Sequence, residues 1–222
     1  MDWTALALSL RLGAATVLIL LPFGVLVGRF LAFRGFRGKG VVEALLALPL
    51  VLPPTVLGFY LLLAFGGNSP MGQTWQSLTG HSLVFSFEGL LFASLIVNIP
   101  FAVQPMQRGF EAIPQEVREA AACSGLPPWR VLWMIDLPLA WPGIVTGLIL
   151  AFAHTLGEFG VVLMVGGSIP GETKTIAIAI YDRVQAFDQH GAGAMSALLL
   201  LLSLVALGVT YVLSSRIGRR HA

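Results

Sequence analysis

The sequence predicts an all-α integral membrane protein with five transmembrane helices, and three observations support this fold class. The composition is 56% hydrophobic and only 11% charged, whereas a soluble domain carries about a quarter charged residues. Apolar stretches of the ~20 residues that a spanning helix needs recur along the chain. The Lys and Arg residues gather in alternate connections between these stretches, as in proteins that cross a membrane several times.

The apolar stretches define the expected spans in chain order, at about 8–28, 44–65, 86–106, 140–165 and 192–213. Together they form one domain over residues 1–222, with its core at about 8–213. The first span contains Pro22 and is followed by basic residues rather than by a small-residue cleavage site. We therefore expect a retained anchor and not a signal peptide. The fourth span has the least defined limits, because a single charge, Glu158, interrupts a long apolar stretch.

The basic residues predict the orientation. Of the 13 Lys and Arg residues, three fall on one side, namely Arg11, Lys174 and Arg183. The remaining ten fall on the other side, and they are Arg29, Arg34, Arg37, Lys39, Arg108, Arg118, Arg130, Arg216, Arg219 and Arg220. Because Lys and Arg accumulate in cytoplasmic loops, we expect a cytoplasmic C-terminus and an N-terminus that faces outward.

Several chemistries are excluded by composition. Cys123 is the only cysteine, so there is no internal disulfide and no multi-cysteine metal site. The four histidines are scattered without the spacing of metal ligands, and we predict no catalytic residue, metal or bound cofactor. A net charge of +2 is too small to indicate nucleic acid as a partner.

The connection at 110–138 has the pattern of a helix–turn–helix on the cytoplasmic surface. Pro114 is suited to the first position of a helix, and Gly125 supplies the left-handed residue that commonly closes one. Pro127 and Pro128 prevent continuation and start a second short helix. From the pattern alone, this segment is either a folded docking element or an amphipathic loop packed on lipid headgroups.

The residues themselves favour the docking element. A Glu-Ala-Ala triplet, a glycine after three further residues and Ile-x-Leu-Pro after nine more resemble the EAA motif of bacterial ABC-importer permeases. The residues that carry it are Glu119, Ala120, Ala121, Gly125, Ile135, Leu137 and Pro138. The resemblance implies a type I importer fold (MetI-like) whose loop docks into a cytoplasmic ABC ATPase subunit. This chain contains no phosphate-binding loop, so ATP is expected to be used by that partner.

Two further stretches narrow the resemblance to the oxyanion importers. Residues 48–58 read LPLVLPPTVLG, and residues 155–160 read TLGEFG, followed by SIPGETKTI at 168–176. Both are similar to molybdate-importer permeases, although the Gly-Glu-Phe-Gly element also resembles sulfate and tungstate permeases. The resemblance implies a periplasmic molybdate-binding protein, a second copy of the chain and the lipid bilayer as further partners.

The same stretches contain the candidates for the translocation path, which are Pro49, Pro53, Pro54, Thr55, Thr155, Gly157 and Glu158. The prolines either kink a helix against its neighbours or line the path directly. The two threonines either offer hydroxyls to an oxyanion or bond carbonyls of their own helices. An ionisable residue inside a membrane is a functional candidate, but a carboxylate repels an anion. We therefore expect Glu158 to order its helix by hydrogen bonding or to pair with a basic group such as His154.

Two rival functions are less consistent with the sequence. A secondary transporter coupled to an ion gradient would show inverted repeats and further midplane charges, and neither is visible. An intramembrane enzyme would need a nucleophile and base or a metal constellation on facing spans, and only His154 and Glu158 are available.

Overall fold

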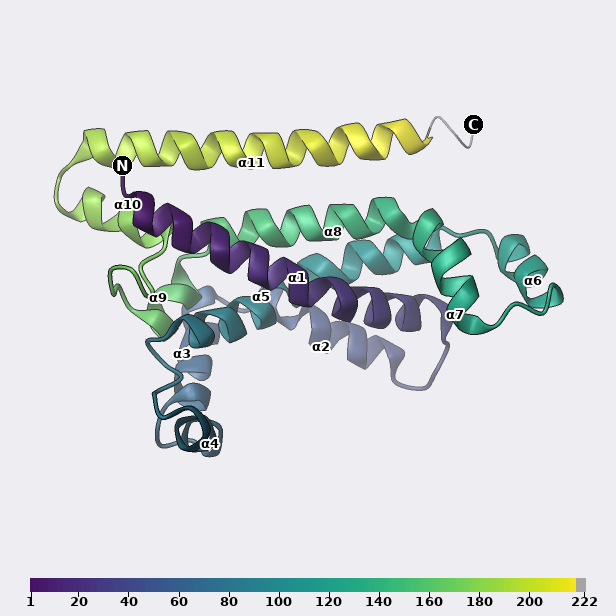
Figure 1. Ribbon diagram of the computed structural model, residues 1–222, viewed down its shortest axis with the longest axis horizontal. Helices are drawn as coiled ribbons and strands as arrows, with labels where there is room; N and C mark the ends of the chain where they lie inside the picture. The colour runs from purple at the N-terminus through teal and green to yellow at the C-terminus, as the bar shows by residue number, and fades with distance from the viewer. Residues whose placement is uncertain (219–222) are drawn as a thin grey trace.

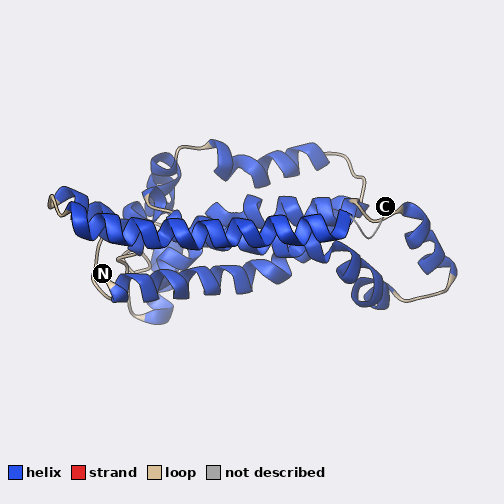
Figure 2. Cartoon of the chain, turned by 90° about the horizontal axis from the view of Figure 1, so that it is seen from above, coloured by secondary structure: helices blue, strands red, loops and turns tan. Residues whose placement is uncertain are grey.

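A computed structural model describes residues 1–218 of the chain as helices joined by short connections, without a strand in that range (Figure 2). Arg219 and Arg220, which the sequence assigned to the cytoplasmic side, lie outside the described residues. The helices in chain order are α1 Trp3–Phe33, α2 Lys39–Val51, α3 Pro54–Phe65, α4 Pro70–Thr79, α5 Phe87–Glu111, α6 Gln115–Cys123, α7 Pro128–Val131, the π-helix η1 Leu132–Asp136, α8 Leu137–Gly157, α9 Gly160–Gly166, α10 Ile176–Gln185 and α11 Gln189–Gly218.

Five segments of the described chain have the length and composition to cross a membrane. Four are continuous helical stretches, built on α1, on α5, on α7 to α8 and on α11. The fifth is α2 and α3 together, which are bent by 107° at a short break. The predicted all-helical fold is confirmed, and the expected number of five spans is reached when α2 and α3 count together as one.

Helix α1 is longer than the predicted span at 8–28 at both ends, and a polar cap closes its first turn. Helix α1 begins at Trp3, where the Asp2 side chain accepts a hydrogen bond of 3.0 Å from the amide of Ala5. Its last turn ends at Phe33, and Arg34 has extended backbone. Such capping satisfies amide groups that the helix leaves unpaired.

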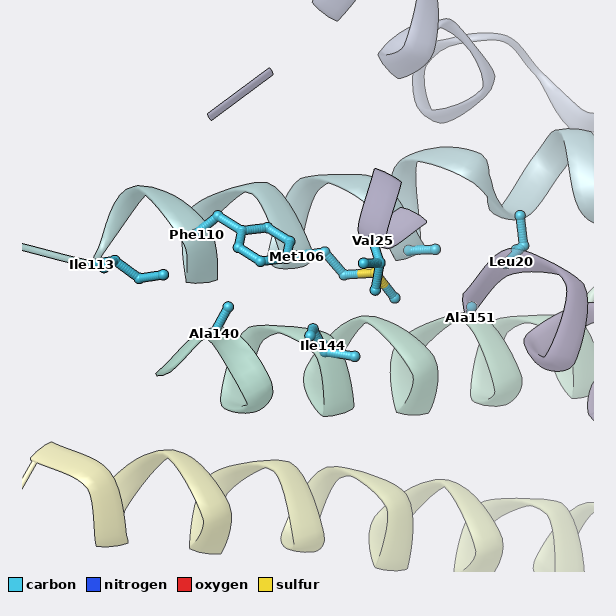
Figure 3. Packing of buried hydrophobic residues seen from close by; sticks show 9 residues of the cluster. Leu20, Val25, Met106, Phe110, Ile113, Ala140, Ile144 and Ala151 are labelled. Atoms are coloured by element: carbon cyan, nitrogen blue, oxygen red, sulfur yellow. The ribbon is translucent and has the colours of Figure 1, made fainter. Parts of the chain in front are cut away.

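The core lies between α1, α5 and α8, which run side by side along the long axis of the molecule (Figures 1 and 2). Helices α5 and α8 approach closely where two glycines meet: a Cβ on Gly143 would lie 2.8 Å from the Cα of Gly109. Small residues at such crossings let membrane helices pack backbone to backbone. Beside this crossing lie the side chains of Figure 3, namely Leu20, Val25, Met106, Phe110, Ile113, Ala140, Ile144 and Ala151.

The remaining helices are peripheral. Helix α11 runs along the outside of the bundle (Figure 1), and only 11% of its most apolar window is buried within this chain. Helix α2 has no buried residue. Helices α6 and α7 project from one end of the molecule and α4 lies toward the opposite end (Figure 1). The apolar sides of α2 and α11 are therefore available to lipid or to another subunit.

Candidate functional site

The break between α2 and α3 is produced by prolines. Helix α2 ends at Val51, and Pro54 is the first residue of α3, where a missing amide hydrogen costs nothing. Pro53 has an extended backbone angle (ψ 134°), and its carbonyl accepts the amide of Leu57 at 3.1 Å to start the new helix. Pro49 lies within α2, and Thr55 is exposed in the first turn of α3. The prolines thus turn the chain sharply inside a span.

The break between α8 and α9 contains no proline. Helix α8 ends at Gly157, and Glu158 adopts extended backbone (φ −68°, ψ 123°). The side chain of Glu158 is 8% exposed, and its Oε1 accepts a 2.9 Å hydrogen bond from the amide of Val161 in the first turn of α9. Glu158 therefore acts as a cap for the helix that follows it.

The imidazole of His154 lies beside the same carboxylate. Its Nε2 is 3.7 Å from Glu158 Oε2, which is too long for a hydrogen bond but within ion-pair distance. The ring stacks on Phe101 of α5, with centroids 4.1 Å apart. Of the two alternatives expected for Glu158, the hydrogen bond is present and is made to the first turn of α9, and the imidazole of His154 lies beside the carboxylate without a hydrogen bond to it.

The two breaks meet in space. Helix α3 packs on α9, and a Cβ added to Gly160 would lie only 2.7 Å from the Cβ of Pro54. One turn later in α3, a Cβ on Gly58 would lie 2.8 Å from Met164. The structure thus places the α2–α3 break, with the candidates at 53–55, against the interruption between α8 and α9, with the candidates at 157–158, and the two form one junction.

A chain of buried polar side chains leads from α1 to this junction. Thr16 donates to Ser94 at 2.9 Å, Ser94 lies 3.3 Å from Thr155, and Asn98 donates to Thr155 at 3.0 Å. The Asn98 oxygen lies 3.2 Å from His154 Nδ1. Thr155 also donates to the carbonyl of its own helix at Ala151, one of the two roles that the sequence left open.

The sequence analysis did not select Thr16, Ser94 or Asn98 as site residues. All three are at most 3% exposed and lie inside the first and third predicted spans. Unpaired polar groups are costly in lipid, so polar side chains inside predicted spans were the signal that could have identified this network.

The 110–138 connection forms the predicted helix–turn–helix. Helix α6 begins at Gln115, one residue after the predicted start at Pro114, and α7 begins at Pro128. Gly125 between them has φ +65°, which confirms its predicted left-handed conformation. The segment projects from the end of the bundle in Figure 1.

The residues of the Glu-Ala-Ala motif divide into an exposed and an anchored group. Glu119, Ala120 and Gly125 are exposed, and Glu119 accepts a 2.7 Å hydrogen bond from Gln115. Ala121 is buried, Ile135 and Leu137 are half-buried, and Leu137 packs against the core cluster; Pro138 is exposed at the start of α8. The first half of the loop therefore exposes Glu119 and Ala120, whereas its second half packs against the helical bundle through Leu137.

The described chain thus combines long apolar helices that could cross a membrane, one bent helix pair and a folded loop that projects from one end. The chain matches the family described as the binding-protein-dependent transport system inner membrane component over residues 21–219, and it belongs to that family. It is accordingly a multi-pass inner-membrane permease component and not an enzyme.

Its sequence relatives include permeases named for molybdenum transport. The chain is 45% identical to the molybdenum transport system permease protein ModB of Azotobacter vinelandii, over 95% of this chain and 93% of that protein. It is 36% identical to the ModB of Escherichia coli K12, over 100% and 96%. A Chlorokybus atmophyticus protein named "Probable sulfate transport system permease protein cysT" is 33% identical, over 86% and 67%.

Solved structures share the fold. A chain of a bacterial ABC transporter involved in the import of alginate superimposes with a TM-score of 0.72 at 15% identity, over 98% of this chain and 78% of that one. A chain of the MetNI methionine ABC transporter in an inward-facing conformation gives 0.68 at 18% identity, over 100% and 94%. The type I (MetI-like) importer fold predicted from the sequence is confirmed.

Proposed function

We propose that this chain is the membrane-spanning permease subunit of an ATP-driven molybdate importer. The observation that carries the proposal is the 45% identity to a molybdenum transport permease over nearly the whole chain. The structure supports it with a junction of two broken spans and a projecting loop. A sulfate permease is the second candidate, since a relative named for sulfate transport aligns at lower identity and over less of its length.

The partners follow from the same proposal. The exposed side of α6, with Glu119 and Ala120, docks on a cytoplasmic ABC ATPase subunit, which binds and hydrolyses ATP. Small side chains allow the ATPase to approach closely, and the carboxylate of Glu119 suits a basic rim. A periplasmic binding protein selects the anion and delivers it at the opposite end of the molecule. The N-terminus is periplasmic and the C-terminus cytoplasmic.

Transport then proceeds by alternating access in a homodimer. Each copy contributes half of the path. The candidate residues at the junction shape that half, together with Pro49 in helix α2. Because the chain lacks helical backbone at both breaks of the junction, this part of the path can change shape without unwinding a continuous helix. Glu158 is engaged with Val161 and His154, so it orders the junction and does not bind the anion.

Purification and uptake test this function. Membranes that express the chain with a molybdate-type ATPase and binding protein should yield a complex in which the ATPase co-purifies with the permease. Vesicles with that complex should accumulate molybdate when ATP and binding protein are supplied. Sulfate and tungstate are then added as competitors, and stronger uptake of sulfate than of molybdate would transfer the proposal to the second candidate.

The coupling role of the loop is tested at Gly125. Its φ of +65° costs a residue with a Cβ about 1–2 kcal/mol, and a Cβ there would meet open space, so only the backbone is strained. Gly125→Val should keep the membrane level but abolish stimulation of ATP hydrolysis by binding protein and molybdate. Glu119→Lys should give a milder loss.

Gly35→Val is the matched control, because a Cβ at Gly35 also meets open space and its φ is not left-handed. If Gly125→Val leaves ATPase affinity and stimulated hydrolysis unchanged while uptake is lost, the loop is not the coupling element.

A further inference from the structure

A buried ion pair joins the end of helix α1 to the end of the 110–138 loop. The Nε of Arg29 lies 2.7 Å from Oδ2 of Asp136, the last residue of η1. The Asp136 residue is 0% exposed, whereas the Arg29 side chain remains 29% exposed. This contact connects a helix of the central core to the segment that carries the exposed motif residues.

Only one of the two carboxylate oxygens of Asp136 is hydrogen-bonded within the described chain. Oδ1 of Asp136 is buried without a hydrogen-bond partner among the described residues, and the contact with Oδ2 uses a single nitrogen of Arg29. Arg commonly binds a carboxylate through two parallel hydrogen bonds. A buried ion pair is weak evidence for stability, and an unpaired buried oxygen requires a further explanation.

A second contact between α1 and the loop lies beside the first. The guanidinium of Arg118 on α6 lies 3.5 Å from the centroid of the Phe33 ring, and that of Arg29 lies 5.7 Å from the same ring. Phe33 also packs edge-on against Phe110 of α5. Both halves of the loop therefore touch the last turns of α1.

The local backbone around Asp136 is also irregular. Residues 132–136 form a π-helix between α7 and α8. Such segments are rare and are frequently found at functional sites. Asp136 therefore lies at the boundary between this irregular turn and the regular helix α8.

We propose that Arg29 and Asp136 are positioning residues that pass movements of the loop to helix α1. In the observed arrangement they share one hydrogen bond. When the ATPase moves the loop, the guanidinium of Arg29 rotates and also donates a hydrogen bond to Oδ1 of Asp136. The pair then has a second, two-bond geometry. This inference rests on the proposed function, since it assumes that the loop receives force from an ATPase.

Arg29→Lys tests the proposal most directly. Lys keeps the charge and one donor toward Oδ2 but cannot form the paired contact. Membrane level, ATPase co-purification and basal ATP hydrolysis should stay near wild type. Molybdate taken up per ATP hydrolysed should fall by at least about fivefold, the lower end of a typical coupling between two sites.

Arg108→Lys is the matched control. Arg108 forms an ion pair of 2.9 Å with Glu111 at the same end of the molecule, but its side chain is 82% exposed. This variant should transport as wild type. A loss of uptake in Arg29→Lys that only follows a loss of protein or of bound ATPase would assign the pair a structural role and overturn the inference.

If Arg29→Lys does not accumulate in the membrane, the double variant Arg29→Met with Asp136→Leu provides a second test. Apolar replacement of both partners removes the buried charges together and often preserves folding. Normal levels with lost coupling support the proposal, whereas normal coupling or failure of this variant to accumulate overturns it. If Gly125→Val uncouples as expected but Arg29→Lys does not, this inference fails alone. If Gly125→Val does not uncouple, the coupling role of the loop fails first, while the permease function is still decided by co-purification and uptake.

Discussion

The helical backbone is interrupted at two neighbouring places in this protein, and the two breaks arise by different means. Between α2 and α3, Pro53 and Pro54 remove backbone donors, so a continuous helix is unfavourable whatever surrounds it. Between α8 and α9, the chain is interrupted without a proline, and the carboxylate of Glu158 satisfies an amide of the new helix. The first break is a local backbone property, and the second depends on one side chain and its neighbours.

The two causes predict which substitutions should disrupt each break. A proline break should tolerate single changes, because two prolines act together and the chain remains turned by the other. A side-chain cap should fail when the acceptor is removed, because a buried amide group is then left unpaired. The predictions below test this difference.

The largest effect is expected at Glu158. Glu158→Leu removes the acceptor of the Val161 amide and should cost about 1–3 kcal/mol at the junction. Glu158→Gln keeps a carbonyl oxygen at the same position and should retain much more molybdate uptake at matched membrane levels. Equal uptake by all three forms would show that the cap is dispensable.

The contact between the breaks comes next. A Cβ at Gly160 would lie 2.7 Å from Pro54, whose ring cannot move aside easily. Gly160→Ala should separate α9 from α3 at a cost of about 1–3 kcal/mol, and uptake should fall while ATPase binding persists. Gly193→Ala, where a Cβ meets open space, is the control. Uptake that is equal in both variants would mean that the two breaks need not touch.

A smaller effect is expected from Pro53→Ala. The new residue has an amide hydrogen that favours continuation of α2, but Pro54 still opposes it. Uptake should therefore fall modestly, while Pro53→Ala with Pro54→Ala should lose more than the sum of the single losses. Simple additivity, measured by the same uptake assay, would contradict the idea that the prolines act as a pair.

The smallest effect is expected at Asp188, whose carboxylate caps the start of α11. Asp188 accepts the amide of Gly191 at 2.9 Å and pairs with Arg183, and the Gly191 amide, followed by Arg183, lowers the pKa of Asp188 below its ordinary value. The cap therefore stabilises the folded state above the unfolded pKa, and this contribution is lost as the pH falls through the lowered pKa.

Asp188→Asn should consequently be slightly less stable than wild type at neutral pH, since Asn is also a good cap. The difference should shrink in acid. Thermal unfolding of the detergent-solubilised protein at neutral and acidic pH measures it, and a difference that grows in acid would disprove the cap.

The parts of the protein that local chemistry controls could be predicted from its sequence. Apolar length predicted the five spans, and prolines with a glycine at 125 predicted the helix–turn–helix, since a helix start, a left-handed residue and a span length depend on neighbours in the chain. The Glu-Ala-Ala motif indicated the type I importer fold. The sequence also indicated Glu158 as a candidate, because a charge within an apolar stretch can be recognised without knowledge of the tertiary structure.

Only the tertiary structure decided which of these pieces meet. The polar chain through Ser94 and Asn98, the approach of Gly160 to Pro54 and the pairing of Arg29 with Asp136 all join residues far apart in sequence. Each depends on how α1, α5 and α8 pack and on the direction in which a side chain leaves its helix. Hydropathy and helical periodicity record which face is buried, but they do not record which partner buries it.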